Sequence, residues 1–259
     1  MQAQLRASMK VVVVSDIHGN LEALTSIPEK FDELWVLGDM VNYGPDPGPV
    51  IDFIQANANV VVRGNHDHAI GCNEDPRCSE PFREMAAAMK EYTRSVLSDS
   101  QKLFLAALPL REGRSIGATR FLCCHATPSQ PLFAYCPPDS PRWQREVEDL
   151  DADLLLVGHT HIPFVREIGL KKVANPGSLG QPKIGRPEAC YAVWNDGTIE
   201  LRSYPYPFEV TIRKIESLPV PSRVKADLAA VLRNGGLLRT GTDGDLLIAN
   251  TPGGNGCVS

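Results

Sequence analysis

The sequence of 259 residues lacks several features that would place it in a specialised class of protein. Its seven cysteines are odd in number and none are spaced Cys-x-x-Cys, which argues against a disulfide framework and against a structural zinc knuckle. No apolar run approaches the length of a transmembrane helix, and residues 1–9 lack the apolar core of a signal peptide. We therefore expect a cytoplasmic protein that does not enter membranes.

The net charge and the lack of internal repeats do not indicate a specialised class either. The formal net charge of −5 gives no general electrostatic reason to bind nucleic acid or an anionic membrane, and the chain has no internal repeats. A chain of this length can bury a sizeable core as one large α/β domain, or as one domain with a small appendage. We expect a single domain over residues 1–238. Residues 239–259 are rich in Gly, Thr and Asn, which predicts a flexible tail.

The stretch 10–20 joins an apolar strand to residue types that bind metals. Val11 to Val14 form an unbroken β-branched run, typical of a strand covered on both faces. Asp16 and His18 follow two apart, so an extended backbone would point both side chains the same way at the carboxyl edge of the sheet. Asn20 is a good N-cap for a helix that begins at residue 21. Taken alone, the same pattern also fits a simple turn whose aspartate caps the helix.

Ligand-type side chains recur where four other apolar strands end. The strands 34–37, 60–62, 120–124 and 154–157 are followed by Asp39, by Asn65 and His66, by His125, and by His159 and His161. Six histidines placed at random would not all lie in or beside such a set, so we interpret it as one site. Mixed imidazole and carboxylate ligands suit manganese, iron, zinc or nickel better than calcium or magnesium. Eight such residues are too many for one ion and fit two ions that share a carboxylate.

The remaining segments predict a scaffold around these strand ends. Residues 81–108 and 142–152 have helical patterns, and residues 224–236 predict a helix with a glycine C-cap. The segments 171–182, 189–206 and 208–216 show β-branched and aromatic alternation, which predicts antiparallel strands that close a second sheet. The loops 71–81 and 126–141 are candidates for the walls of a substrate pocket, although a plain surface connection fits the second equally well.

Together these motifs resemble the calcineurin-like metallophosphoesterase superfamily. The resemblance rests on DIH at 16–18, GD at 38–39, GNHD at 64–67, the lone His125 and GHTH at 158–161, in that order. NPGS at 175–178 and YGPDP at 43–47 make the chain most similar to the small bacterial and archaeal phosphodiesterases of the superfamily. The fold that this resemblance implies is a four-layer α/β/β/α sandwich, with two mixed sheets flanked by helices.

The resemblance also implies a role for each site residue. The first ion would be held by Asp16, His18 and His161, the second by Asn65, His125 and His159, and Asp39 would bridge the two. His66 matches the catalytic histidine beside the leaving group, and Asp67 would orient it. The two ions, Mn²⁺ first with Fe, Zn or Ni as alternatives, would activate a bridging hydroxide for in-line attack on phosphorus.

The leading hypothesis is therefore a metal-dependent phosphodiesterase acting on a small or nucleotide-like phosphoester. Two alternatives are a phosphomonoesterase or dinucleoside-polyphosphate hydrolase with the same site, and a non-catalytic scaffold, since the retromer complex has a subunit of this fold. A protein phosphatase is disfavoured, because Asn42, Tyr43 and Gly44 stand where those enzymes have Asp-Arg-Gly. The sequence does not define the oligomeric state.

Five further residues near the motifs have more than one interpretation. Lys183 and Arg186 could supply positive charge for a phosphate, or could simply be solvated. Cys72 and Cys78 could form a redox pair or an accessory metal site, or could be ordinary reduced thiols. His68 has no role in the family pattern, and we consider either a supporting contact or simple exposure.

Overall fold

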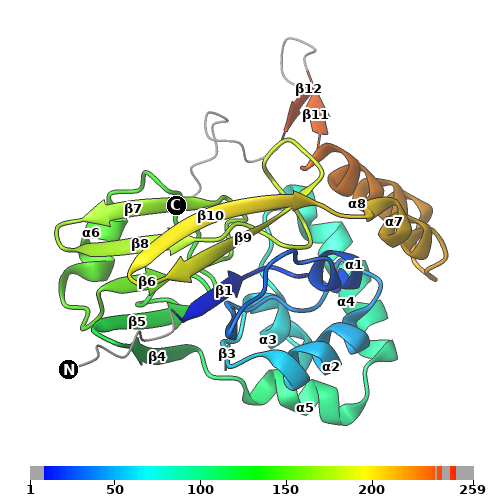
Figure 1. Cartoon of the computed structure of the whole chain (residues 1–259). Helices are drawn as coiled ribbons and strands as arrows, with labels where there is room; N and C mark the ends of the chain where they lie inside the picture. Colours follow the sequence, from blue (N-terminus) through cyan, green and yellow to red (C-terminus); the bar gives the residue numbers. More distant parts are fainter. Residues whose placement is uncertain (1–8, 237, 241–245, 249–259) are drawn as a thin grey trace.

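Two five-stranded sheets form the centre of the protein in a computed structural model that describes residues 9–236, 238–240 and 246–248 (Figure 1). The first sheet has the order β10-β9-β1-β2-β3, and the second has the order β4-β5-β6-β8-β7. In the first sheet, β1 and β2 pair in parallel, β2 and β3 pair in parallel, and β9 is antiparallel to β1. In the second, β5, β6 and β8 are parallel, with antiparallel strands β4 and β7 at the edges. The strands are β1 (Lys10–Val14), β2 (Glu33–Val36), β3 (Val60–Val61), β4 (Arg111–Ile116), β5 (Thr119–Cys124), β6 (Leu154–Leu156), β7 (Phe164–Ile168), β8 (Lys171–Asn175), β9 (Glu188–Asn195) and β10 (Thr198–Pro205).

Helices cover the outer faces of both sheets and complete the expected α/β/β/α sandwich (Figure 1). Trp143 and Val147 of α6 pack on the outer face of the second sheet, and the other helices lie on the side of the first sheet. The helices are α1 (Leu21–Thr25), α2 (Pro47–Asn57), α3 (Asn65–Cys72), α4 (Glu80–Val96), α5 (Asp99–Ala107), α6 (Arg142–Glu148), α7 (Phe208–Glu216) and α8 (Ser222–Asn234). Within the described residues, no helix is both long and apolar enough to cross a bilayer.

The valine run of β1 is buried on both faces, as its composition predicts. Val11 and Val13 point between the two sheets, where they join an aromatic core that includes Trp35 and Phe121. The alternating residues, Val12 and Val14, pack into the cluster formed with α1 and α2. Burying each such side chain stabilises the fold by about 1.5–3 kcal/mol. The strand that leads to the candidate site is therefore held from both sides.

Two expectations for the last third of the chain are wrong. Strands β9 and β10 extend the first sheet beside β1 rather than closing the second sheet. Residues 208–216 form the helix α7, because Phe208, Ile212 and Ile215 are spaced four and three apart and bury one helical face. Their β-branched composition indicated a strand, and packing against α8 decided otherwise.

Strands β4 and β7 were not expected from the sequence. β4, whose residues are exposed or only half-buried, is an edge strand with a charged sequence, so it carries little of the apolar alternation that identifies strands. The glycine C-cap of α8 is confirmed, since Gly235 follows the helix in the left-handed conformation.

Most of the segment expected to be a flexible tail lies outside the described residues. Two short strands are described there, β11 (Leu238–Thr240) and β12 (Leu246–Ile248), which pair in antiparallel fashion. Because α7 and α8 share a core cluster with α4, we propose that a single domain reaches residue 238.

Candidate metal centre

The loops that follow the parallel strands bring the predicted ligands to one edge of the sandwich. Their backbone is not extended as expected: Asp16 has φ of 54° and His18 has φ of 49°, and Asp39, His159 and His161 also have positive φ. Left-handed backbone is unfavourable for such residues and is typical of functional sites. The loops are held by backbone hydrogen bonds, from Asp16 N–H to the Gly38 carbonyl (3.0 Å) and from His18 N–H to the Asp39 carbonyl (2.9 Å).

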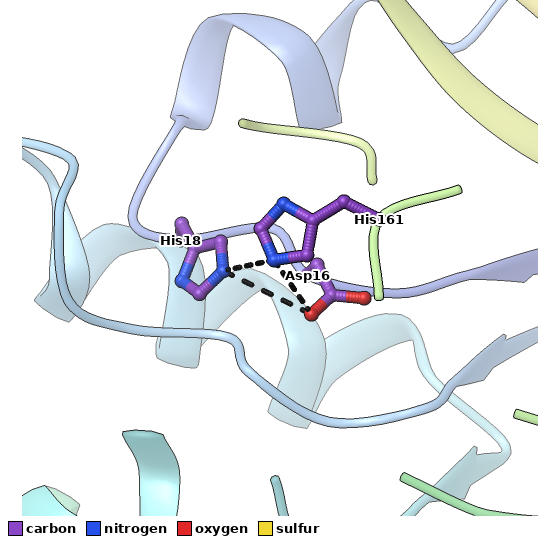
Figure 2. A group of neighbouring side chains, drawn as sticks. All are labelled: Asp16, His18 and His161. Carbon is purple, nitrogen blue, oxygen red and sulfur yellow. Dashed lines mark hydrogen bonds and ion pairs between the residues drawn. The ribbon is translucent and has the colours of Figure 1, made fainter. Parts of the chain in front are cut away.

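Asp16, His18 and His161 form the first ligand group (Figure 2). The Nε2 atoms of the two histidines lie 3.2 Å apart, although the residues are 143 positions apart in the chain. Asp16 Oδ1 lies 3.2 Å from Nε2 of His161 and 3.9 Å from Nε2 of His18. All three side chains are buried.

The hydrogen bonds of this first group leave only lone pairs facing its centre. Nδ1 of His18 donates to the Val41 carbonyl (3.2 Å), and Nδ1 of His161 donates to the Gln181 carbonyl (2.7 Å), because a carbonyl can only accept. Burial lowers the pKa of both imidazoles, so they are neutral at pH 7 and each Nε2 carries a lone pair. Asp16 Oδ1 is buried and accepts no hydrogen bond from a described residue. Three acceptors that face one another without a donor fit a bound cation.

Asp39, His125 and His159 form the second ligand group, with Asn65 beside them. Nε2 of His125 lies 3.2 Å from Asp39 Oδ2 and 3.1 Å from Asn65 Oδ1. The Asn65 amide is oriented by its Nδ2, which donates to the Pro76 carbonyl at 2.7 Å, so its oxygen faces the group. The donor set of one carboxylate, one amide oxygen and two imidazoles also fits a divalent transition metal.

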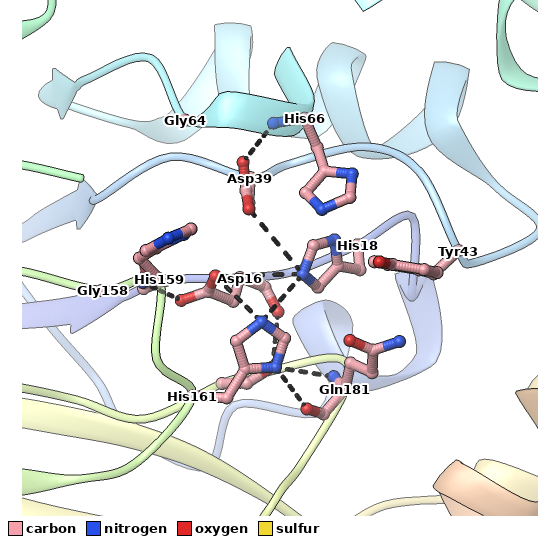
Figure 3. Close-up of polar contacts among 12 residues, drawn as sticks. Asp16, His18, Asp39, Tyr43, Gly64, His66, Gly158, His159, His161 and Gln181 are labelled. Atoms are coloured by element: carbon pink, nitrogen blue, oxygen red, sulfur yellow. Dashed lines mark hydrogen bonds and ion pairs between the residues drawn. The ribbon is translucent and has the colours of Figure 1, made fainter. Parts of the chain in front are cut away.

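Asp39 lies between the two groups (Figure 3). Its Oδ2 is 3.2 Å from Nε2 of His125 in the second group and 4.0 Å from Nε2 of His18 in the first. Its Oδ1 accepts the backbone N–H of His66 at 2.8 Å, which fixes the carboxylate. A Cβ atom at Gly64 would lie 2.0 Å from Asp39 Oδ1, so only glycine permits this approach. One carboxylate oxygen is thus placed where both groups can share it.

The two groups differ in their affinity for protons. Burial lowers the pKa of His125, but the neighbouring Asp39 carboxylate outweighs this effect and raises the pKa to about 9. For His159, burial and the positive charge of His125 lower the pKa to about 3. A cation that binds the second group therefore has to displace a proton from His125.

The contacts of Asp67, the residue that the family pattern gives as orienting His66, are with backbone groups. Its carboxylate accepts the backbone N–H groups of Asp39 (2.8 Å), Met40 (2.9 Å) and Gly64 (3.0 Å). Asp67 therefore holds together the loop that carries Asp39 and the loop that carries His66. Among the described residues, these three backbone groups are the hydrogen-bond donors to the Asp67 carboxylate.

Asn42 and Cys78, which the sequence did not single out for this role, contact His66. Nδ2 of Asn42 lies 2.8 Å from Nδ1 of His66, and the Cys78 thiol lies 3.4 Å from its Nε2. The His66 ring is 5.1 Å from the His18 ring, centroid to centroid, and both flank Asp39 (Figure 3). The only signal in the sequence was that Asn42 stands at the first position of the motif where protein phosphatases have Asp-Arg-Gly.

A cavity of about 420 Å³ opens over the second ligand group and His66. Both loops expected to form pocket walls contribute to it, with Arg77 and Cys78 from the first and Phe133 and Tyr135 from the second. Lys183 also lines the cavity.

The other groups left open by the sequence lie apart from this cavity or have local partners. Arg186 pairs with Glu188 at 2.7 Å on the surface. His68 lies 3.3 Å from Glu74 and 3.5 Å from the thiol of Cys72. Cys72 and Cys78 are free thiols with different neighbours, and no metal group among the described residues includes them.

Comparison with known proteins identifies the class. The family model of the calcineurin-like phosphoesterase superfamily domain matches residues 9–196, so the chain belongs to this superfamily and is a phosphoester hydrolase. It is 30% identical over 236 residues to the uncharacterized protein MJ0912 of Methanocaldococcus jannaschii, covering 82% of this chain and 93% of that protein. It is 28% identical over 203 residues to the phosphodiesterase YfcE of Escherichia coli, covering 73% of this chain and 89% of that protein. A solved structure of a metallophosphoesterase from Sphaerobacter thermophilus superposes with a TM-score of 0.73 at 26% identity, covering 87% of this chain and all (100%) of that one.

Proposed function

We propose that the protein is a phosphodiesterase that uses two divalent ions to hydrolyse a small or nucleotide-like phosphoester. The observation that carries this proposal is the first ligand group, where lone pairs face one another with no hydrogen-bond donor between them. The second ligand group lies beside it and includes Asp39, which approaches both groups. The similarity to the phosphodiesterase YfcE supports the same reaction class.

We assign each ligand residue to one of the two ions from its position in the two ligand groups. Asp39 is the shared ligand, the first ion is assigned to Asp16, His18 and His161, and the second to Asn65, His125 and His159. When bound, the ions supply a nucleophile from water at neutral pH and neutralise the phosphoryl oxygens. We propose Mn²⁺ first, with Fe, Zn or Ni as alternatives, because this mixed donor set suits them.

His66 is the proposed proton donor to the departing alkoxide. The Asn42 amide is held by two contacts, since its Oδ1 accepts the Tyr43 N–H (3.0 Å) and its Nδ2 donates to the Ala86 carbonyl (3.3 Å). Nδ2 of Asn42 also lies 2.8 Å from Nδ1 of His66, which holds the ring in place. Burial lowers the pKa of His66, but the charges of Cys78 and Asp39 outweigh this effect and raise the pKa to about 9, so the imidazole carries a proton to give near pH 7. Its Nε2 faces Cys78 beside the cavity.

The test is hydrolysis of two chromogenic esters with added Mn²⁺. We expect activity on bis-p-nitrophenyl phosphate, a diester, to exceed activity on the monoester p-nitrophenyl phosphate. Activity on the monoester alone would support a phosphomonoesterase instead. No activity on either ester with Mn²⁺, Fe²⁺, Zn²⁺ or Ni²⁺ would favour the scaffold, which the complete set of ligand residues argues against.

A further inference from the structure

Two cations at the cavity have no acidic partner among the residues that the structure describes. Lys183 is only 8% exposed, and its Nζ lies 4.6 Å from the centroid of the Phe82 ring. The Arg77 guanidinium lies 4.3 Å from the centroid of the Phe133 ring. All four side chains line the cavity over the second ligand group. Aromatic faces hold these cations in place without neutralising their charge.

Lys183, which has no acidic partner in the described part of the chain, contrasts with two more exposed cations. Lys214, which is more exposed, lies 2.5 Å from Glu22 and 2.8 Å from Asp46. Arg186, three positions after Lys183, pairs with Glu188. A nearly buried ammonium is costly without an anion, so the position of Lys183 indicates a ligand that supplies one.

Gln181 adds an unused donor to the same cavity. Its side chain is 3% exposed, and its Nε2 has no hydrogen-bond partner among the described residues. The backbone carbonyl of Gln181 accepts the Nδ1 hydrogen of His161, which places this residue beside the first ligand group (Figure 3). The cavity thus offers an amide N–H and two cations, a set that matches the oxygens of a phosphate.

The charge of a simple diester does not account for these groups. Two divalent ions bring four positive charges, which the two ligand carboxylates, a hydroxide nucleophile and the one negative charge of a diester balance completely. Lys183 and Arg77 add two positive charges that such a substrate leaves unused. A substrate with a further phosphate beside the scissile one would use them.

We propose that Lys183, Gln181 and Arg77 bind a second phosphate group, so that the substrate is a nucleotide-like polyphosphate ester rather than a diester with a single phosphate. Phe133 and Tyr135, the latter 47% exposed, lie at the same cavity and provide faces for a base. This inference rests on the proposed phosphodiesterase function and specifies the substrate class of that site.

The experiment compares kcat/KM for diadenosine tetraphosphate and for bis-p-nitrophenyl phosphate in the Mn²⁺-loaded wild type and in Lys183→Met. Methionine keeps an apolar stem over Phe82 and removes the charge. We expect kcat/KM for the tetraphosphate to fall about 10–100-fold, the range of a charged hydrogen bond, and the loss for the small diester to be at least about tenfold smaller. Lys183→Arg should recover most of the loss.

One control variant and three possible outcomes keep the two proposals distinguishable. Arg186→Gln removes a cation from the same loop that already has a partner, and its kcat/KM for both esters should match the wild type. Equal losses on both esters in Lys183→Met would overturn the second-phosphate assignment, as would a wild type that cleaves bis-p-nitrophenyl phosphate but not the tetraphosphate. A wild type that cleaves neither ester refutes the proposed function itself.

Discussion

The two ligand groups are built alike but respond differently to protons. Each takes side chains from loops at the carboxyl ends of strands, and each includes one histidine of the GHTH motif. In the first group, burial lowers the pKa of both His18 and His161, and the charge of Lys183 lowers that of His161 further. In the second, His125 faces the Asp39 carboxylate and retains a proton. The same residue types thus give two different sites, because burial outweighs the Asp16 carboxylate at His161, whereas the Asp39 carboxylate outweighs burial at His125.

The largest expected effect comes from removing Asp39, the residue that we propose both ions share. Asp39→Ala should lose both ions and reduce kcat by about 10⁴-fold, because the electrostatic stabilisation from both ions is lost. Metal content per chain, measured by mass spectrometry after Mn²⁺ loading, checks the first part. His161→Ala is the matched variant and should lose only the first ion. Full metal content in Asp39→Ala would show that the groups do not share this ligand.

His66→Ala should separate catalysis from metal binding. We expect kcat to fall by about 10²–10⁴-fold, the usual contribution of a general acid, while two ions per chain remain. The measurement is again metal content together with steady-state kinetics. If the purified variant held no metal, His66 would belong to the ligand set rather than to proton transfer.

Gly64→Ala tests how tightly the shared carboxylate is held. A Cβ there would lie 2.0 Å from Asp39 Oδ1, so the carboxylate must shift and Mn²⁺ affinity should fall about 10–100-fold. Gly113→Ala is the control, because nothing lies within 4 Å of a Cβ at that position in β4. Equal affinities in the two variants, measured by titration calorimetry, would contradict the close packing of this loop.

The mildest change, a shift of pH by one unit, should alter metal affinity in one group only. Because the second ion binds neutral His125, whose pKa is raised to about 9, its binding releases a proton, and its affinity should rise about tenfold per pH unit from pH 6 to 8. The first group already has neutral imidazoles, so its affinity should change little over this range. Calorimetry in two buffers with different ionisation enthalpies measures how many protons are released when each ion binds. If the affinities for both ions depended equally on pH, the proposed difference in proton binding between the two groups would be wrong.

Much of the fold and of the site could be predicted because the signals are local. The valine run of β1 indicated a strand buried on both faces, and each ligand-type residue follows or lies close to the end of an apolar strand. Residues 208–216, which form α7, were predicted as a strand because they include β-branched residues such as Ile212 and Ile215. Such residues also occur in helices when packing against a neighbouring element favours the helix. The position of β9 beside β1 depends on pairing over a long separation, which no local pattern encodes.

The contacts of His66 also could not be predicted from local sequence patterns. Asp67 is its neighbour in the sequence and yet binds backbone N–H groups, while Asn42 and Cys78 approach the ring from other loops. Lys183 could be noted as a cation from the sequence. What distinguishes it from Arg186 is its burial against Phe82, with no acidic partner in the ranges that the structure describes.

The sequence by itself determined which ligand-type residues end each strand, and therefore the superfamily and the chemistry of the centre. Only the tertiary structure brings these side chains together in space: His159 and His161 are two positions apart, yet one lies with His125 and the other with His18, the division that the resemblance implied. The physical reason is that left-handed backbone turns send neighbouring side chains in different directions, and packing between distant strands decides what they meet.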